Sequence, residues 1–324
     1  MERVGLLPGD FQVRSFLLTL AHDQRRAHTN VSVRTFWASK ICERDCNRDA
    51  LDIECLVEAA GRLESVLEPL GVGYRATPAA DLGPTQFGSY SFLLTAYISG
   101  ANRGLGNAIA KQLLADGYTV SAGARDIEAL KSALGDEAGE RLMCNRYDAF
   151  DNDSATAWVE ATVERFGRID GMVNNAGIID LEPFDDITEE SLDQMWAVNV
   201  KAPLRLTQLA MPHLRVAGEG RVVNVASLSG IRLKGSFAPG YAMTKHAVMA
   251  LTEATKQAGW EDGIRVTALC PGFVATDMTS DFGEDTSTMI DPADIAVLVS
   301  TTISLPNTAQ VAALTVSCRL EPHV

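Results

Sequence analysis

The stretch TAYISGANRGLGNAIA, residues 95–110, decides the fold of this chain. It runs from an apolar segment typical of a β-strand, through three glycines, into a segment with the period of a helix. Gly100, Gly104 and Gly106 lie where the strand ends and the helix begins. Residues without a Cβ let the chain turn sharply and let a pyrophosphate approach the backbone, while the amides at the helix start attract its charge. The spacing G-x3-G-x-G differs from the more common G-x-G-x-x-G, so the surrounding sequence has to decide what the turn binds.

From about residue 92 onward, strand-like and helix-like segments alternate. Seven apolar runs have the length of buried strands, at 91–99, 118–124, 141–147, 169–176, 221–227, 264–270 and 311–317. Segments with a helical period lie between them, at 107–117, 153–167, 190–214 and 241–258. Strict alternation predicts a doubly wound α/β (Rossmann) domain over residues 92–324, with a seven-stranded parallel sheet and helices on both faces. Such a sheet binds ligands at the carboxyl ends of its strands.

The first 91 residues lack this order and form an irregular N-terminal extension of unknown role. One amphipathic helix is expected over residues 50–71. Three interpretations compete: a segment that mediates assembly, a leader without fixed structure, or upstream sequence translated because the true start is a Leu or Val codon near Leu93 or Leu94. The first methionine after the initial one, Met143, lies beyond the glycine turn. We favour the third interpretation because the extension shows no sustained periodicity.

The bulk composition excludes several classes of protein. Apolar residues make up 46% and charged residues 22%, which are globular values, and no apolar run approaches the length of a membrane span. The formal charge of −14 argues against nucleic acid or an anionic membrane as a main partner, because phosphate binding needs a clustered basic face.

Six cysteines are spread along the chain without a preceding signal peptide, which predicts free thiols in a reducing, cytoplasmic setting. Cys42, Cys46 and Cys55 follow His22 and His28, but their spacing fits no common zinc pattern. We therefore expect no metal site.

Six motifs give the glycine turn its context: SGANRGLG at 99–106, NNAG at 174–177, VNV at 198–200, VVNVASLSG at 222–230, YAMTK at 241–245 and PGFVAT at 271–276. In order and spacing they resemble the short-chain dehydrogenase/reductase family over residues 92–324. The resemblance implies a nicotinamide-dependent oxidoreductase that interconverts a carbonyl compound and its alcohol, assembled as a homodimer or homotetramer. Ser99 and Ala226 depart from the family's usual Thr and Ser, and neither change touches the expected chemistry.

Tyr241 and Lys245 are four residues apart in a segment with a helical period, so their side chains share a face. A neighbouring cation favours the phenolate form of a tyrosine, whose ordinary pKa of about 10 is too high for efficient proton transfer at neutral pH. The resemblance implies that Tyr241 is the general acid/base, that Ser227 hydrogen-bonds the substrate oxygen and that Lys245 lowers the tyrosine pKa and holds the ribose. It also implies that Asn199 positions a water next to Lys245. Ser229 is an alternative to Ser227, but its position does not match that of the serine in the family's motif.

The choice of coenzyme follows from charge. The second predicted strand ends with Ala124, where the family's ribose-binding acid would stand, followed by Arg125, and Arg103 lies inside the glycine turn. Two guanidinium groups suit the 2′-phosphate of NADP(H) better than a neutral ribose edge. Asp126, twenty residues after Gly106, is the competing ribose ligand that would indicate NAD(H). We favour NADP(H).

The remaining coenzyme contacts are implied by the resemblance. Asp148 matches an acid that binds adenine, and Asn174 and Asn175 have two possible roles, along the coenzyme or within the central sheet. The full set of expected coenzyme-binding residues is Gly100, Asn102, Arg103, Gly104, Leu105, Gly106, Arg125, Asp148, Ala149, Asn175, Gly177, Tyr241, Lys245, Pro271, Gly272, Val274 and Thr276.

The resemblance also makes residues 274–291 a substrate lid. Its acidic residues, Asp277, Asp281, Glu284 and Asp285, disfavour a bulky anionic substrate, so we expect a small carbonyl or hydroxy compound. Gly235, Phe237 and Pro239 either line the opposite wall or simply form a loop. The alternative is that the protein binds and senses NADP(H) without catalysis. Loss of one of the four catalytic residues would have indicated such a sensor, and all four are present.

Overall fold

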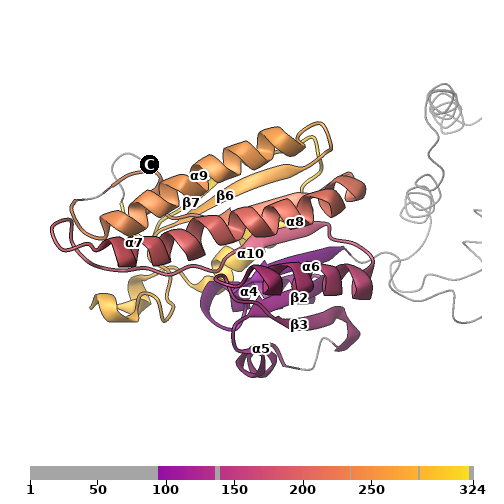
Figure 1. Cartoon of the computed structure of the whole chain (residues 1–324), viewed down its shortest axis with the longest axis horizontal. Coiled ribbons are helices and arrows are strands. Elements are labelled where there is room, and N and C mark those ends of the chain that lie inside the picture. Colours follow the sequence, from indigo (N-terminus) through magenta and orange to yellow (C-terminus); the bar gives the residue numbers. More distant parts are fainter. Residues whose placement is uncertain (1–93, 136–138, 234, 284, 321–324) are drawn as a thin grey trace, which may run out of the picture. The chain divides into compact units, whose positions relative to one another are not determined.

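The computed structural model describes residues 94–135, 139–233, 235–283 and 285–320, and in these ranges it confirms the predicted fold. One sheet has the strand order β3-β2-β1-β4-β5-β6-β7, and every neighbouring pair is parallel (Figure 1). The strands are β1 (Thr95–Ser99), β2 (Thr119–Ala124), β3 (Leu142–Arg146), β4 (Gly171–Asn174), β5 (Arg221–Val225), β6 (Arg265–Pro271) and β7 (Ala313–Val316). The expected helix at 50–71 and the cysteines and histidines of the extension lie outside the described residues.

Helices cover both faces of the sheet. One face holds α4 (Gly104–Ala115), α5 (Ile127–Leu134) and α10 (Pro292–Ser304); the other holds α6 (Asn152–Phe166), α8 (Ala202–Ala217) and α9 (Pro239–Gly259), with α7 (Glu189–Trp196) against α9 (Figure 1). Successive side chains of a strand point to opposite faces. Ile98 accordingly packs in the core with α4, whereas Tyr97 packs in the core with α6 and stacks on Trp158. A sheet buried on both faces explains why its strands are continuous apolar runs.

The helices differ from the sequence expectation in two respects. The segment expected as one helix at 190–214 contains α7, a π-helical turn at Ala197–Lys201, and α8. Helices α5 and α10 are not among the segments that the sequence pattern predicts. The first has only eight residues, too short for a clear period, and the second is apolar around most of its circumference.

The chain runs outward from β1 to β2 and β3, then crosses back to β4 on the other side of β1. This reversal opens a crevice at the carboxyl ends of β1 and β4, where ligands of doubly wound sheets bind. The glycine turn follows β1 and therefore lies at this crevice. Among the described residues, no helix combines the length and apolar character that a bilayer crossing requires.

A substitution at Gly106 tests how closely the glycine turn packs against its neighbours. A Cβ at this position would overlap the carbonyl oxygen of Gly100 and the side-chain amide of Asn175. We expect Gly106→Ala to lower the free energy of unfolding by about 1–3 kcal/mol, because the backbone must move to admit the methyl group. Thermal and denaturant unfolding measure the change.

Gly171→Ala is the matched control. Gly171 lies in β4, and the heavy atom nearest to the position of its Cβ, the carbonyl oxygen of Arg221, is 3.7 Å away, so a methyl group fits there without displacing the backbone. Equal destabilisation by the two substitutions would contradict the close contact at Gly106.

Candidate active site

A cavity of about 730 Å³ opens at the carboxyl edge of the sheet. It brings together every predicted site residue except Gly106 and Asn199. The predicted residues that line it are Gly100, Asn102, Arg103, Gly104, Leu105, Arg125, Asp148, Ala149, Asn175, Gly177, Ser227, Tyr241, Lys245, Pro271, Gly272, Val274 and Thr276. Both exceptions are buried residues outside the cavity lining. Gly106 leaves room for Gly100 and Asn175, and Asn199 makes hydrogen bonds described below.

The glycine turn forms the floor at the start of α4. Gly100 and Gly104 have φ angles of +67° and +54°, and a Cβ on Gly100 would lie 3.0 Å from the Cα of Ala176. Arg103 precedes the helix in an extended conformation, and no side chain caps the helix start. The amides of the first turn therefore stay available to an anion such as a pyrophosphate.

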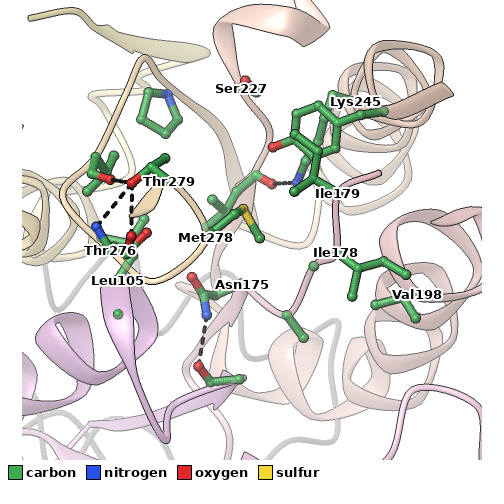
Figure 2. Close-up of a pocket in the computed structure, with 18 of the residues that line it drawn as sticks. Leu105, Asn175, Ile178, Ile179, Val198, Ser227, Lys245, Thr276, Met278 and Thr279 are labelled. Atoms are coloured by element: carbon green, nitrogen blue, oxygen red, sulfur yellow. Dashed lines mark hydrogen bonds between the residues drawn. The ribbon is translucent and has the colours of Figure 1, made fainter. Parts of the chain in front are cut away.

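Asn174, the last residue of β4, and Asn175, which follows it, each take one of the two roles that the sequence left open. The Asn174 side-chain nitrogen donates to Asn224 Oδ1 (2.7 Å) and Thr207 Oγ1 (3.0 Å), so this residue joins the sheet to α8. The Asn175 nitrogen donates to the carbonyl oxygens of Ser99 (3.0 Å) and Gly100 (3.1 Å). Asn175 thus fixes the glycine turn and also faces the cavity (Figure 2).

The charged residues beside the glycine turn are those expected of a phosphate-binding site. Arg103 and Arg125 both line the cavity. Asp126 also borders it, but its Oδ1 accepts hydrogen bonds from the amides of Glu128 (3.1 Å) and Ala129 (3.0 Å). This carboxylate therefore caps α5, which weakens its case as the ribose ligand of NAD(H).

Asp148, the expected adenine ligand, lies at the cavity wall after β3. Its Oδ1 accepts a hydrogen bond from the amide of Phe150 at 3.1 Å, and its own amide donates to Ser154 Oγ at 3.1 Å. These bonds hold the loop that carries Ala149 in a fixed shape. The adenine-binding role of Asp148 stays a prediction.

Ser227, Tyr241 and Lys245 meet on one side of the cavity. Ser227 follows β5, and its hydroxyl hydrogen-bonds Tyr241 and accepts the amide of Ser229 at 3.1 Å. One turn along α9, Lys245 Nζ donates to the carbonyl oxygen of Val225 at 2.8 Å and lies 5.5 Å from the centre of the Tyr241 ring. Figure 2 shows Thr276 and Thr279 on the side opposite Lys245. The bond to Tyr241 favours Ser227 over Ser229 as the catalytic serine.

Burial is the main cause of the pKa shifts of Tyr241 and Lys245. It raises the pKa of Tyr241 to about 12, and the Ser227 hydrogen bond only partly opposes it. Burial also lowers the pKa of Lys245 to about 8. The expected lowering of the tyrosine pKa by Lys245 is therefore not found: loss of water around the phenol is the largest cause of the shift, and the Ser227 hydrogen bond is the one that lowers the pKa. At neutral pH the phenol keeps its proton and the lysine is still mainly an ammonium.

Asn199 lies in the π-helical turn and is buried. Its Oδ1 accepts the amide of Ile178 (2.9 Å), and its Nδ2 donates to the Ile178 carbonyl (2.9 Å) and to Thr244 Oγ1 (3.0 Å). The side chain therefore ties the loop after β4 to α9 beside Lys245. Its water-positioning role stays a prediction.

The sequence analysis missed the apolar wall of the cavity, formed by Ile178, Ile179, Val198, Leu233, Met278 and Phe282. Val198 belongs to the VNV motif, and Met278 and Phe282 lie in the expected lid, but neither pattern marks these side chains as apolar wall. Ile178, Ile179 and Leu233 belong to no motif. Of the three residues proposed for the opposite wall, Phe237 lines the cavity, whereas Pro239 begins α9. Glu284 of the expected lid lies outside the described residues.

The chain belongs to the short chain dehydrogenase family, whose sequence pattern matches residues 94–287. The six motifs and the cavity that they line agree with this membership.

Three similar proteins illustrate the relation of this chain to known reductases and dehydrogenases. An agropine synthesis reductase of Rhizobium rhizogenes is 48% identical over 69% of this chain and 52% of its own length, so the chain spans about half of that relative. An alcohol dehydrogenase from Thermococcus sibiricus, solved with 5-hydroxy-NADP, is 30% identical with a TM-score of 0.64 and covers 69% of this chain and 95% of its own. A 3-ketoacyl-(acyl-carrier-protein) reductase from Brucella melitensis, solved with NADH, is 27% identical with a TM-score of 0.65 and covers 69% and 97%.

The buried lysine generates a prediction about stability. Its folded pKa of about 8 lies below the usual 10.5, so burial of the ammonium costs roughly 3 kcal/mol below pH 8, and this cost disappears as the pH rises to 10.5. Lys245→Met removes the titrating group. We expect the stability of the variant relative to the unchanged protein to fall by roughly that amount between pH 8 and 10.5, measured by denaturant unfolding.

Lys111→Met is the control, because Lys111 is exposed on α4. Its stability difference from the unchanged protein should stay flat over the same pH range. A flat difference for Lys245→Met as well would show that the lysine is not destabilised by burial.

Proposed function

We propose that this chain reduces a small ketone or aldehyde to the alcohol and uses NADP(H) as coenzyme. One observation carries the proposal: Ser227, Tyr241 and Lys245 lie in the same cavity as the glycine turn and two arginines. Proton transfer and coenzyme binding can therefore act on one bound molecule. When bound, the nicotinamide supplies the hydride that reaches the carbonyl carbon.

The chain's own residues handle the proton. The Ser227 hydroxyl, next to the phenol, stabilises the charge that develops on the carbonyl oxygen, and Tyr241 donates the proton that completes the alcohol. A phenol with a pKa raised to about 12 keeps its proton at neutral pH, so it can serve as the proton donor in this step. Lys245, an ammonium below about pH 8, stabilises the phenolate that the transfer leaves behind.

The coenzyme choice rests on the local charges. The two solved relatives carried an NADP derivative in one case and NADH in the other, so likeness alone does not decide. In this chain Arg103 and Arg125 flank the cavity, while Asp126 is committed to the start of α5. A doubly charged phosphate gains from both cations, and a ribose hydroxyl does not.

The substrate end of the cavity supports a compound with an apolar body. Phe237 and Met278 line it while 56% and 41% of their surface stays exposed, so a ligand can bury that surface. Phe237 stacks edge-on against Phe282, with ring centres 6.4 Å apart, which joins the loop before α9 to the loop after β6. A small carbonyl compound with an apolar substituent fits this wall best.

We also propose that residues 92–324 form the catalytic domain, with residues 1–91 as an extension, and that the protein acts in the cytoplasm. The family match begins at residue 94, which supports that boundary. As the family resemblance implies, the assembly is a homodimer or homotetramer. Light scattering of the full chain and of residues 92–324 measures it.

Tyr241→Phe tests the catalytic assignment. The variant keeps the ring and loses the proton, so we expect NADPH binding within about twofold of the unchanged protein and carbonyl reduction lowered about 100- to 10,000-fold. Fluorescence titration and NADPH absorbance with a panel of carbonyl compounds measure the two quantities. Ser229→Ala is the control and should keep most of the activity. Turnover that survives in Tyr241→Phe would contradict the assignment, and cellular function that survives without turnover would favour the NADP(H) sensor.

Arg125→Ala and Arg103→Ala test the coenzyme. Each removes a charged hydrogen-bond donor, so each should weaken NADPH binding by about 10- to 100-fold and leave NADH binding nearly unchanged. Lys111→Ala, which removes an exposed charge from α4, is the control. Tighter binding of NADH than of NADPH by the unchanged protein would contradict the choice of NADP(H).

A further inference from the structure

Arg103, one of the two cations assigned to the coenzyme, already has a partner. Its Nη1 donates to Oδ2 of Asp277 at 3.1 Å, and 67% of each side chain is exposed. Asp277 follows the PGFVAT motif, 174 positions further along the chain, and both residues line the cavity. Within the described residues Arg125 makes no ion pair, so the two cations differ.

The backbone on both sides of this pair is fixed. Arg103 precedes Gly104, whose missing Cβ leaves room for Thr276, with 3.3 Å between the position of that Cβ and Thr276 Cγ2. Thr279 Oγ1 lies 2.6 Å from the carbonyl oxygen of Val274 and 2.9 Å from that of Thr276, and it accepts the Thr276 amide at 3.3 Å (Figure 2). These contacts place the turn that carries Asp277 against the glycine turn.

We propose that Asp277 is a specificity residue that competes with the 2′-phosphate of NADP(H) for Arg103 and so limits the preference for the phosphorylated coenzyme. The inference rests on the proposed use of NADP(H). A phosphate monoester carries nearly two negative charges at neutral pH, so a carboxylate on the same guanidinium repels it. NAD(H) has no charge at this position and leaves the ion pair intact. Asp277 therefore weakens the binding of one coenzyme and not of the other.

The size of the effect follows from the exposure of the pair. An exposed ion pair contributes little to stability, and salt screens it. The competing carboxylate should therefore change the affinity for the phosphorylated coenzyme modestly, by about 3- to 10-fold at low salt. The same exposure predicts that the effect becomes smaller as the ionic strength rises.

Asp277→Asn in the full chain is the direct test, because the amide keeps the shape of the side chain and loses its charge. We expect about 3- to 10-fold tighter binding of NADPH and of 2′,5′-ADP, which carries the phosphate without a nicotinamide. NADH binding should change less than about twofold. Fluorescence titration measures the two dinucleotides, and displacement of NADPH measures 2′,5′-ADP.

Two comparisons make the result specific. Asp294→Asn removes an exposed charge in the first turn of α10, away from the cavity, and should leave all three affinities unchanged. In the Arg103→Ala background, Asp277→Asn should no longer tighten NADPH binding, because the shared partner is gone.

The outcomes separate this inference from the proposed function. Unchanged or weaker NADPH binding in Asp277→Asn overturns the competition, and weaker binding would mean that Asp277 orients Arg103. A gain shared equally by NADH, or a gain that persists without Arg103, also overturns it. If Arg103→Ala and Arg125→Ala leave NADPH binding unchanged, it is the proposed coenzyme that fails.

Discussion

The close contact between the glycine turn and the loop after β4 is the constraint on which the site depends. Ser99 Oγ accepts the amides of Asn175 (3.0 Å) and Ala176 (3.1 Å), and the Asn175 side chain returns hydrogen bonds to the turn. Only residues without a Cβ fit between these elements at Gly100 and Gly106. The contact brings β1 and β4 together at the reversal of the sheet, and the cavity opens there. Ser99, where the family usually has Thr, makes both amide contacts with its hydroxyl.

A second constraint lies on the side of the cavity that holds Tyr241 and Lys245, where the fold buries an ammonium group beside a phenol. Lys245 is 4% exposed and has one backbone carbonyl as its hydrogen-bond acceptor. Burial of a charge with so few partners opposes folding, so the proposed role of Lys245 beside Tyr241 accounts for this position better than stability does. The phenol of Tyr241, whose pKa is raised to about 12 by loss of water, keeps its proton at neutral pH, as the proposed proton donor must.

The sequence predicted the parts of the fold that carry their own periodicity. Seven apolar runs became seven parallel strands, and the pair Tyr241 and Lys245 lies on one face of α9 as the four-residue spacing requires. Features that depend on contacts between distant segments were not predictable. The capping role of Asp126 needed the start of α5, and the partner of Arg103 stands 174 residues away. The sign of the Tyr241 pKa shift depends on how much water the folded cavity removes, which no spacing reveals.

The π-helical turn at Ala197–Lys201 has a consequence for how this chain tolerates changes in length. An α-helix advances about 100° per residue, so loss of one residue here would turn α7 against α8 by roughly that angle. Gln194 would then leave the cavity wall, and the Asn199 amide would lose its register with Ile178. A single-residue deletion in this turn is therefore expected to disturb the cavity wall and the Asn199 contacts together.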